Sequence, residues 1–454
     1  MGGAYGKGTN RTENEKEKAF DFKKLDARVD HIYVDGLSRT KDDIIHKICH
    51  DLFQSTNFEE MLQHAHSTKT KLESIGCFHN NIVIHLDTSS GPGATPEYGY
   101  DVTFKVKELR PVAGGVDTMV GLNNEALLTG RVSTPNLVGR GERLEGSFRQ
   151  GSKETRRYNL SLWKPLLLSK NGSSVSASVF GDIQDWPPCK FKLGESGIML
   201  DFVYNNSKYM RNSIGWEGCV RDVAVGNRYA AFEVRENAGS TLKSSLKHTL
   251  EYDTRGSLSK ILPSAGLLAQ LTSEYAGLGG NVGFFKTNGL FRVDIPLPAD
   301  FVLQGTLNGG YMVPLHTDNK GVSICDNFFL GGPVTFRGFD FRGAGPNIDG
   351  SFLGAKMYWS AGLSLFTPLP FRPKLGGFGD NFRAHFFSNV GNIGSFNIAD
   401  GASLMDNARL ACGLGLAMRL GQMARLELNY CFPVWVRDGD RSIHGIQVGL
   451  GTTP

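Results

Sequence analysis

The chain has 454 residues, with 57 glycines, 29 phenylalanines and a formal net charge of +4. Its mean hydropathy is −0.22, and no apolar run approaches the ~18–20 residues of a membrane-spanning helix, which excludes a helical membrane protein. The aromatic content excludes a disordered chain, and the small, dispersed positive charge offers no stripe for binding nucleic acid.

Residues 1–28 are polar and are predicted to be a disordered segment. They lack the apolar stretch of a secretory signal, so none is expected. The seven cysteines show no paired spacing, which favours reduced thiols in a protein made in the cytosol.

Residues 29–110 are predicted to form a small α/β domain. A short strand ends at Gly36, and a helix follows with Thr40 as its N-cap. A second helix opens at Asn57, and two alternating strands, "NIVIHLDT" and "YDVTFKVKE", complete the domain. This strand–helix–helix–strand–strand order resembles a POTRA domain, the polypeptide-transport-associated module.

Histidines are concentrated in this domain, so a metal site has to be weighed. His46 and His50 stand four residues apart on the first helix, and His64 and His66 lie on the second. No adjacent glutamate or further ligand completes a zinc set, which favours a solvated helix face over a metal site.

From Pro111 onward, apolar and polar residues alternate with a period of two. In 423–432, one face is apolar and the other carries Arg425, Glu427 and Asn429. Strands with one apolar and one polar face are typical of a lipid-facing barrel with a water-filled interior. A tilted strand of about ten residues is long enough to cross a bilayer.

Sixteen segments are predicted to be strands on this pattern: 116–123, 142–150, 156–164, 174–184, 195–204, 208–220, 226–237, 242–254, 264–275, 281–294, 300–312, 353–365, 382–390, 407–420, 423–432 and 442–450. Closure of such a sheet leaves no unpaired edge in lipid. The sequence therefore predicts an all-β transmembrane barrel of sixteen antiparallel strands over 111–454, after the small N-terminal α/β domain. A long loop, 313–352, is expected to fold inward.

That loop contains "GGPVTFRGF" (331–339). Gly331, Gly332, Arg337, Gly338 and Phe339 resemble the signature of the long sixth loop in the outer-membrane barrel-assembly superfamily, which includes the bacterial BAM-type barrels. The family has an aliphatic residue where this chain has Phe336.

Two further segments are similar to that superfamily. "NLVGRGERLEGSF" (136–148) resembles the entry to the second strand. "RLACGLGLAMRLGQMARLELNYCFP" (409–433) resembles the closing hairpin, with Ala411 in place of a serine. Within the superfamily, the single POTRA-like domain and "FFSNVGN" (386–392) look most like the sorting and assembly machinery (SAM/TOB) barrel of the mitochondrial outer membrane.

This resemblance implies an insertase that receives unfolded β-barrel precursors, of porin and import-channel type, from the intermembrane space. It would release them, folded, into the outer membrane, with its N-terminal domain in the intermembrane space. The resemblance also implies metaxin-like subunits on the cytosolic face and the cristae-organising contact-site complex of the inner membrane as partners. No nucleic acid is expected to bind.

Family members pair the loop arginine with an acidic or polar group inside the barrel. For Arg337, the resemblance implies Glu427 or Asn389 as that partner. Bacterial members commonly have Asp at the position of Asn389, so a neutral hydrogen bond is expected there in place of an ion pair.

The first and last predicted strands are short or rich in glycine, which suits a seam that opens to receive a precursor strand. The residues singled out on the two strands are Gly115, Val116, Gly121, Gly445, Val448 and Leu450. The last segment also resembles a mitochondrial β-signal, with Ile443 in its polar slot. An ordinary closing strand is the alternative.

No catalytic, cofactor or metal site is predicted. "GLSLF" (362–366) lacks the final glycine of a serine-hydrolase elbow, so an enzyme is not expected. The alternative functions are a passive β-barrel pore and an exporter of the two-partner-secretion type. A signal peptide and two POTRA domains would favour the exporter.

Overall fold

A computed structural model of the chain describes residues 25–90, 98–120, 125–166, 172–226, 228–256, 260–315, 322–369, 378–396, 401–421 and 424–452. The chain divides into two compact units between Leu109 and Arg110. In the described ranges, no helix has the length and apolar character needed to cross a membrane.

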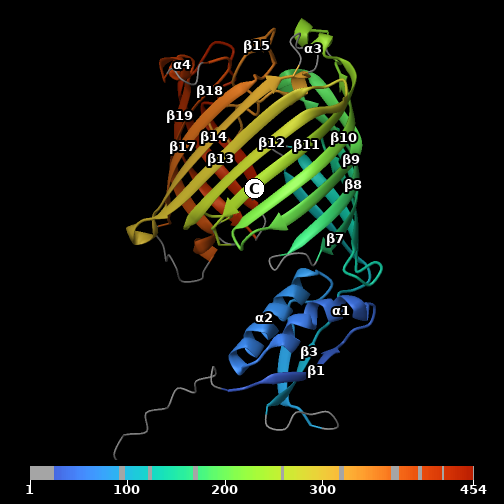
Figure 1. Cartoon of the computed structure of the whole chain (residues 1–454). Coiled ribbons are helices and arrows are strands. Elements are labelled where there is room, and N and C mark those ends of the chain that lie inside the picture. Colours follow the sequence, from blue (N-terminus) through green and yellow to red (C-terminus); the bar gives the residue numbers. More distant parts are fainter. Residues whose placement is uncertain are drawn as a thin grey trace, which may run out of the picture. The chain divides into compact units, whose positions relative to one another are not determined.

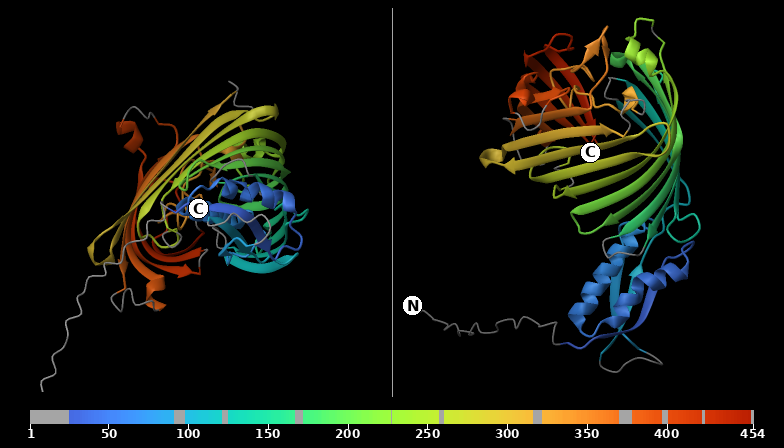
Figure 2. Two further views of the ribbon diagram at one scale, coloured as in Figure 1. Left: turned by 60° about the horizontal axis from the view of Figure 1, so that its bottom comes forward. Right: turned by 45° about the horizontal axis from the view of Figure 1, so that its top comes forward.

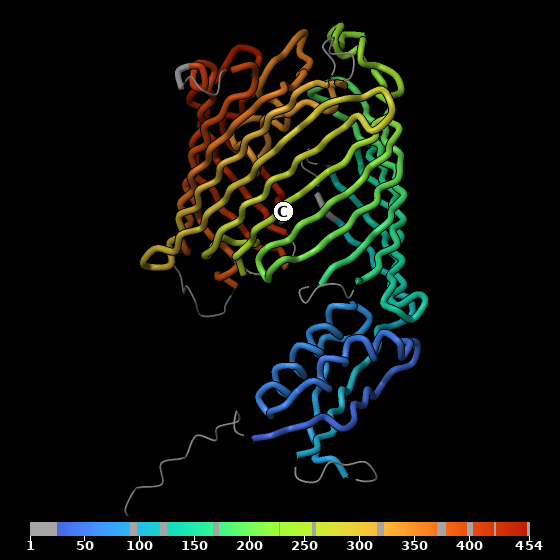
Figure 3. Tube along the Cα trace, in the orientation of Figure 1, coloured from blue at the N-terminus to red at the C-terminus, as the bar shows by residue number. Residues whose placement is uncertain are grey.

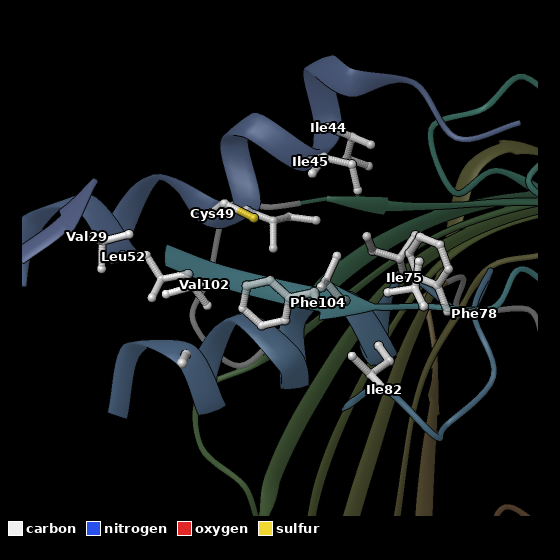
Figure 4. Packing of buried hydrophobic residues seen from close by; sticks show 14 of the residues in the cluster. Val29, Ile44, Ile45, Cys49, Leu52, Ile75, Phe78, Ile82, Val102 and Phe104 are labelled. Atoms are coloured by element: carbon white, nitrogen blue, oxygen red, sulfur yellow. The ribbon is translucent and has the colours of Figure 1, made fainter. Parts of the chain in front are cut away.

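The N-terminal unit is a small α/β fold. Its elements are β1 (Arg28–Asp35), α1 (Asp42–Cys49), the 3-10 helix η2 (His50–Gln54), α2 (Phe58–Ser74), β2 (Val83–Thr88) and β3 (Gly99–Lys105). The strand β3 is central in the three-stranded sheet, parallel to β1 and antiparallel to β2. Ile44 and Cys49 of α1 and Leu52 of η2 pack with Val102 and Phe104 of β3, so one apolar helical face and one sheet face share the core (Figure 4).

The two helix starts in this unit differ from each other. Asn57 caps α2 as predicted, since its side chain accepts from the Glu60 amide at 2.8 Å. Thr40 does not cap α1, which begins at Asp42; its hydroxyl instead donates to Glu108 at 2.7 Å. Burial raises the pKa of Glu108, but hydrogen bonds from the backbone and side chains of residues 38–40 outweigh it and lower the pKa to about 2.

The second unit is built on a sixteen-stranded antiparallel sheet in which each strand pairs with its neighbours along the chain. Its strands are β4 (Ala113–Val120), β5 (Ala126–Pro135), β6 (Arg143–Gly151), β7 (Arg156–Leu166), β8 (Ser173–Trp186), β9 (Phe191–Asn205), β10 (Met210–Ala224), β11 (Gly239–Asp253), β12 (Gly266–Gly280), β13 (Phe284–Pro296), β14 (Val302–Pro314), β17 (Met357–Pro368), β18 (Phe382–Ile393), β19 (Arg409–Leu420), β20 (Ala424–Trp435) and β21 (Gly445–Thr452). The sheet curls into a barrel of tilted strands (Figures 1 and 3). The predicted fold class is confirmed.

The barrel has an apolar outside and a polar inside. On β20, Leu428 and Tyr430 face outward and are 48% and 46% exposed, whereas Glu427 and Asn429 face inward and are 0% and 1% exposed. A soluble β-protein has the opposite arrangement. An exterior of this kind is suited to lipid, since the backbone groups are paired within the sheet.

The strand predictions contain two errors, one segment that is not a strand and one strand that was not predicted. In the predicted strand 226–237, the described residues 228–237 form no strand: they include a short helix, α3 (Phe232–Glu236), whose Val234 is buried together with the preceding Ala230 and Ala231. The strand β5 was missed, since Gly130 and Pro135 weaken its pattern. The two errors cancel in the count. As a result, 136–148 enters the third strand of the sheet, not the second.

Short elements occupy the loops of the barrel: η3 (Pro187–Cys189), η4 (Pro298–Asp300), η5 (Ile324–Asp326), β15 (Asn347–Ile348), β16 (Ser351–Phe352), η6 (Phe378–Asn381) and α4 (Gly401–Met405). The loops after β8, β10 and β14 share a core that includes Trp186, Val234 and Phe352. They follow the fifth, seventh and eleventh strands, so they meet at the same end of the barrel.

Candidate functional site

The loop between β14 and β17 folds inside the barrel. In Figure 2, its orange trace lies between red strands on one side and green strands on the other. Gly338 sits at φ 86°, and a Cβ placed there would lie 2.6 Å from the Cβ of Ala411 on β19. Only glycine allows the loop backbone to approach the wall this closely.

Arg337 forms a bidentate ion pair with Glu427 of β20. Its Nε donates to Oε2 at 2.8 Å and its Nη2 donates to Oε1 at 3.0 Å. Glu427 is fully buried, and it also binds Arg425 at 2.7 Å and the Asn429 amide at 3.1 Å. The carboxylate therefore has partners on both oxygens, as a buried charge requires.

Asn389 on β18 contacts the backbone of the loop, and not the guanidinium. Its Nδ2 donates to the carbonyl of Arg337 at 3.1 Å. The guanidinium itself lies 5.2 Å from the centre of the Phe387 ring, also on β18. Both candidate partners of Arg337 are thus brought to it, in different ways.

The two phenylalanines that flank Arg337 and Gly338 anchor the loop in an apolar cluster. Phe336 and Phe339 stack with ring centres 5.2 Å apart, and they are 1% and 0% exposed. The cluster also contains Leu330, Ala344 and Ile393. Position 336 is therefore a packing position, and an aromatic residue fills it as an aliphatic one would. Gly331 and Gly332, at φ 118° and 134°, turn the chain into this cluster.

The residue that sequence reasoning missed is Gln447 on β21. Its Oε1 accepts from the Gly338 amide at 3.0 Å, and its Nε2 donates to the Phe339 carbonyl at 2.9 Å. Gln447 pairs across the ladder with Asn429, two residues beyond Glu427 on the same inward face. Extending that face across the hairpin would have found it.

The sheet has two ends, β4 and β21, which we call the seam. In the described residues, these two strands are not hydrogen-bonded to each other. Gly115 and Val116 lie on β4, and Val116 is 72% exposed. The other predicted seam residues, Gly445, Val448 and Leu450, lie on β21. The side chain of Val448 faces outward. Gly121 lies outside the described residues.

The histidines of the N-terminal unit do not converge. His46 and His50 are exposed, and His64 Nδ1 lies 3.0 Å from the Ser55 hydroxyl. In the part of the chain that the structure describes, no three His, Cys, Asp or Glu side chains are grouped to hold a metal ion.

Comparison with known proteins identifies the family. The model of the Omp85 superfamily domain matches residues 136–453. The sorting and assembly machinery component 50 homolog of Mus musculus is 40% identical, over 99% of this chain and 95% of the relative. The homolog of Homo sapiens is also 40% identical, over 94% and 90%. The chain belongs to the Omp85 superfamily, in its sorting and assembly machinery component 50 family.

Among solved structures, BamA of Haemophilus ducreyi lacking POTRA domains 1–3 has a TM-score of 0.74 with this chain, at 17% identity. The match covers 94% of this chain and 84% of that one, and it shows a shared fold. With the apolar exterior, family and fold identify an outer-membrane type of β-barrel. The family match includes the loop with Arg337 and the β18–β21 wall that binds it.

Proposed function

We propose that this protein folds β-barrel precursors and inserts them into the mitochondrial outer membrane, as the name of its relatives suggests. The observation that carries the proposal is the seam, whose two end strands lie in the lipid-facing wall without being paired to each other in the described residues. A precursor strand in lipid has unpaired N–H and C=O groups, each of which costs several kcal/mol. An edge strand at the seam offers partners for them, which is strand addition inside a membrane.

The loop with Arg337 gives the seam a defined inner support. It binds β18, β20 and β21 through Asn389, Glu427 and Gln447, respectively. A loop packed into the interior argues against a passive pore, one of the alternatives that the sequence leaves open. Strand exchange makes and breaks only hydrogen bonds, so we propose no enzymatic step and no cofactor.

We further propose that the N-terminal α/β unit acts as a POTRA domain in the intermembrane space, where it receives precursors of porin and import-channel type. Its strand order and its small size support this assignment. Metaxin-like subunits would bind on the cytosolic face, and the cristae-organising contact-site complex would bind from the inner membrane.

The proposal is tested by crosslinking a stalled precursor. One cysteine is placed in the last strand of the precursor and one in this protein, at Val116 or Ile446, which are 72% and 68% exposed on the two seam strands. Leu307 on β14, 53% exposed on the same outer surface, is the matched control. We expect disulfides at the seam positions and not at position 307. Equal crosslinking at all three would contradict insertion at the seam.

A further inference from the structure

A second buried ion pair holds the same loop on another wall of the barrel. Asp326 ends η5 at the start of the loop, and Arg221 lies on β10. Arg221 Nη1 donates to Oδ1 at 2.6 Å, and Nη2 donates to Oδ2 at 3.0 Å. The two residues are 2% and 5% exposed.

Further contacts fix this end of the loop. Lys286 on β13 donates to the Asp326 carbonyl at 2.6 Å, and its ammonium lies 4.3 Å from the centre of the Phe328 ring. Asp326 is also the third residue of a capping box with Ser323. The carboxylate is therefore preorganised for Arg221 before the loop meets the wall.

The two ion pairs lie on opposite sides of the barrel. The strand β10 is seventh in the sheet and β20 is fifteenth, so seven of the sixteen strands lie between them in either direction around the barrel. The loop supplies Asp326 at one side and Arg337 at the other, only eleven positions later. Figure 2 shows the loop between the two walls.

The segment between the two ion pairs, residues 327–336, is held by backbone hydrogen bonds. Phe328 exchanges backbone hydrogen bonds with Ala355 at 2.8 and 3.0 Å, and the Ala344 amide donates to Leu330 at 3.1 Å. The Gly332 amide donates to the Phe339 carbonyl at 3.3 Å. A short segment that is hydrogen-bonded to the rest of the loop along its length transmits a displacement of one end to the other, whereas a flexible one does not.

We propose that residues 323–339, which we call the brace, tie the far wall of the barrel to the seam, with Arg221, Asp326 and Lys286 as positioning residues. The seam strand β21 pairs with only one neighbour in the described sheet, so its position depends on what holds it from inside. Gln447 holds β21 from inside through its hydrogen bonds to Gly338 and Phe339, and the brace connects this contact to Arg221 on β10. The effect on precursor insertion rests on the proposed function, whereas the mechanical tie does not.

The tie is tested first without any precursor. Spin labels are placed on the outer surface at Ile214 of β10 and Leu428 of β20, in the full-length protein in lipid nanodiscs, and their distance distribution is measured. We expect Arg221→Gln and, independently, Asp326→Asn to broaden or shift the distribution. Asp326→Asn changes only the loop, so it retains the intact wall if Arg221→Gln fails to fold.

The matched control is Lys243→Gln on β11. Lys243 is a buried lumenal cation whose partners, Glu217 and Glu274 at 3.1 and 3.0 Å, are both wall residues. It therefore removes buried ion pairs that lie entirely within the wall and that make no hydrogen bond to the brace, and the distance distribution should stay as in the wild type. An unchanged distribution in Arg221→Gln and Asp326→Asn, or the same change in Lys243→Gln, would overturn the brace.

The second measurement is the rate of precursor insertion. Loss of the ion pair at either end breaks the same connection between the two walls. We therefore expect Arg221→Gln and Arg337→Gln each to slow insertion by about fivefold or more. The double variant should be no slower than the slower of the two single variants. Multiplying defects would show two independent clamps and refute the brace. Changed distances with normal insertion in all variants would leave the mechanical tie in place and refute its role in insertion, whereas a wild-type protein that inserts no precursor would refute the proposed function.

Discussion

Replacing Arg337 by alanine tests the contact on which the site depends. The substitution removes both hydrogen bonds to Glu427, at 2.8 and 3.0 Å, and the contact with the Phe387 ring. It leaves the backbone contacts of Gly338 and Phe339 with Gln447 in place. The substitution therefore weakens the binding of the loop to the barrel wall at one contact and leaves its other contacts intact.

The size of the effect follows from what Glu427 retains. Breaking a buried ion pair costs about 3–5 kcal/mol when the remaining charge is left alone. Here Glu427 retains Arg425 at 2.7 Å and Asn429 at 3.1 Å, so the loss is that of a charge-assisted hydrogen bond, about 1.5–3 kcal/mol. The docked loop then loses population on the order of 10- to 100-fold relative to other poses. The sixteen-strand ladder is unaffected, so the barrel should persist.

The assay is the insertion of a radiolabelled precursor into isolated membranes, with heat-modifiability on gels as the measure of an intact barrel. Arg337→Ala should slow insertion and retain the heat-modifiable form. Arg337→Lys should recover only part of the rate, because a point charge does not reproduce the planar fork. Glu427→Gln should be more severe than Arg337→Ala, since Arg425 loses its partner as well. Normal insertion by Arg337→Ala would refute the role given to this loop.

The remaining predictions concern other residues and the N-terminal unit. Asn389→Asp should slow insertion less than Arg337→Ala in the same assay, because it removes one neutral hydrogen bond. Glu108→Gln should cost the N-terminal unit about 1–3 kcal/mol. In the wild type, the stabilisation from Glu108 is fully present above the unfolded pKa of ~4.3 and is lost as the pH falls towards the folded pKa of about 2, which hydrogen exchange of the amides at 38–40 would show. Deletion of 29–110 should leave a heat-modifiable barrel, since the sixteen strands pair among themselves; loss of the barrel would make that unit structural. Protease should cleave within 29–110 only after the mitochondrial outer membrane is ruptured, and cleavage in intact mitochondria would reverse the orientation.

Alternation predicted most of the barrel because a strand between lipid and a polar interior must carry both kinds of side chain in strict order. It failed where another force decides the local structure. Ala230, Ala231 and Val234 at the start of α3 are buried against neighbouring loops, which a strand pattern does not foresee. Gly130 interrupts the pattern of β5, and that strand is stabilised by pairing on both sides with β4 and β6.

Of the two buried ion pairs of the loop, the sequence predicts one and not the other. Glu427 could be found because the family resemblance implies an acidic or polar partner for Arg337, and the alternation of residues places Glu427 on the inward face of its strand. The pair Arg221 and Asp326 could not be found, since one lies among many lumenal charges and the other in a loop segment without a periodic pattern. Partners so far apart in sequence are set by the closure of the barrel, which brings the loop to β10.

Position 389 shows why an amide suits this wall where bacterial relatives of the family commonly have a carboxylate. The oxygens of Glu427 already accept from Arg337, Arg425 and Asn429, so the guanidinium of Arg337 has its carboxylate. The group that still needs a partner is the carbonyl of Arg337, and a buried carbonyl without a donor costs about 1–3 kcal/mol. An amide donates to a carbonyl, and an ionised carboxylate does not. Asn389 supplies that donor at 3.1 Å, so β18 binds the backbone of the loop while β20 neutralises its charge.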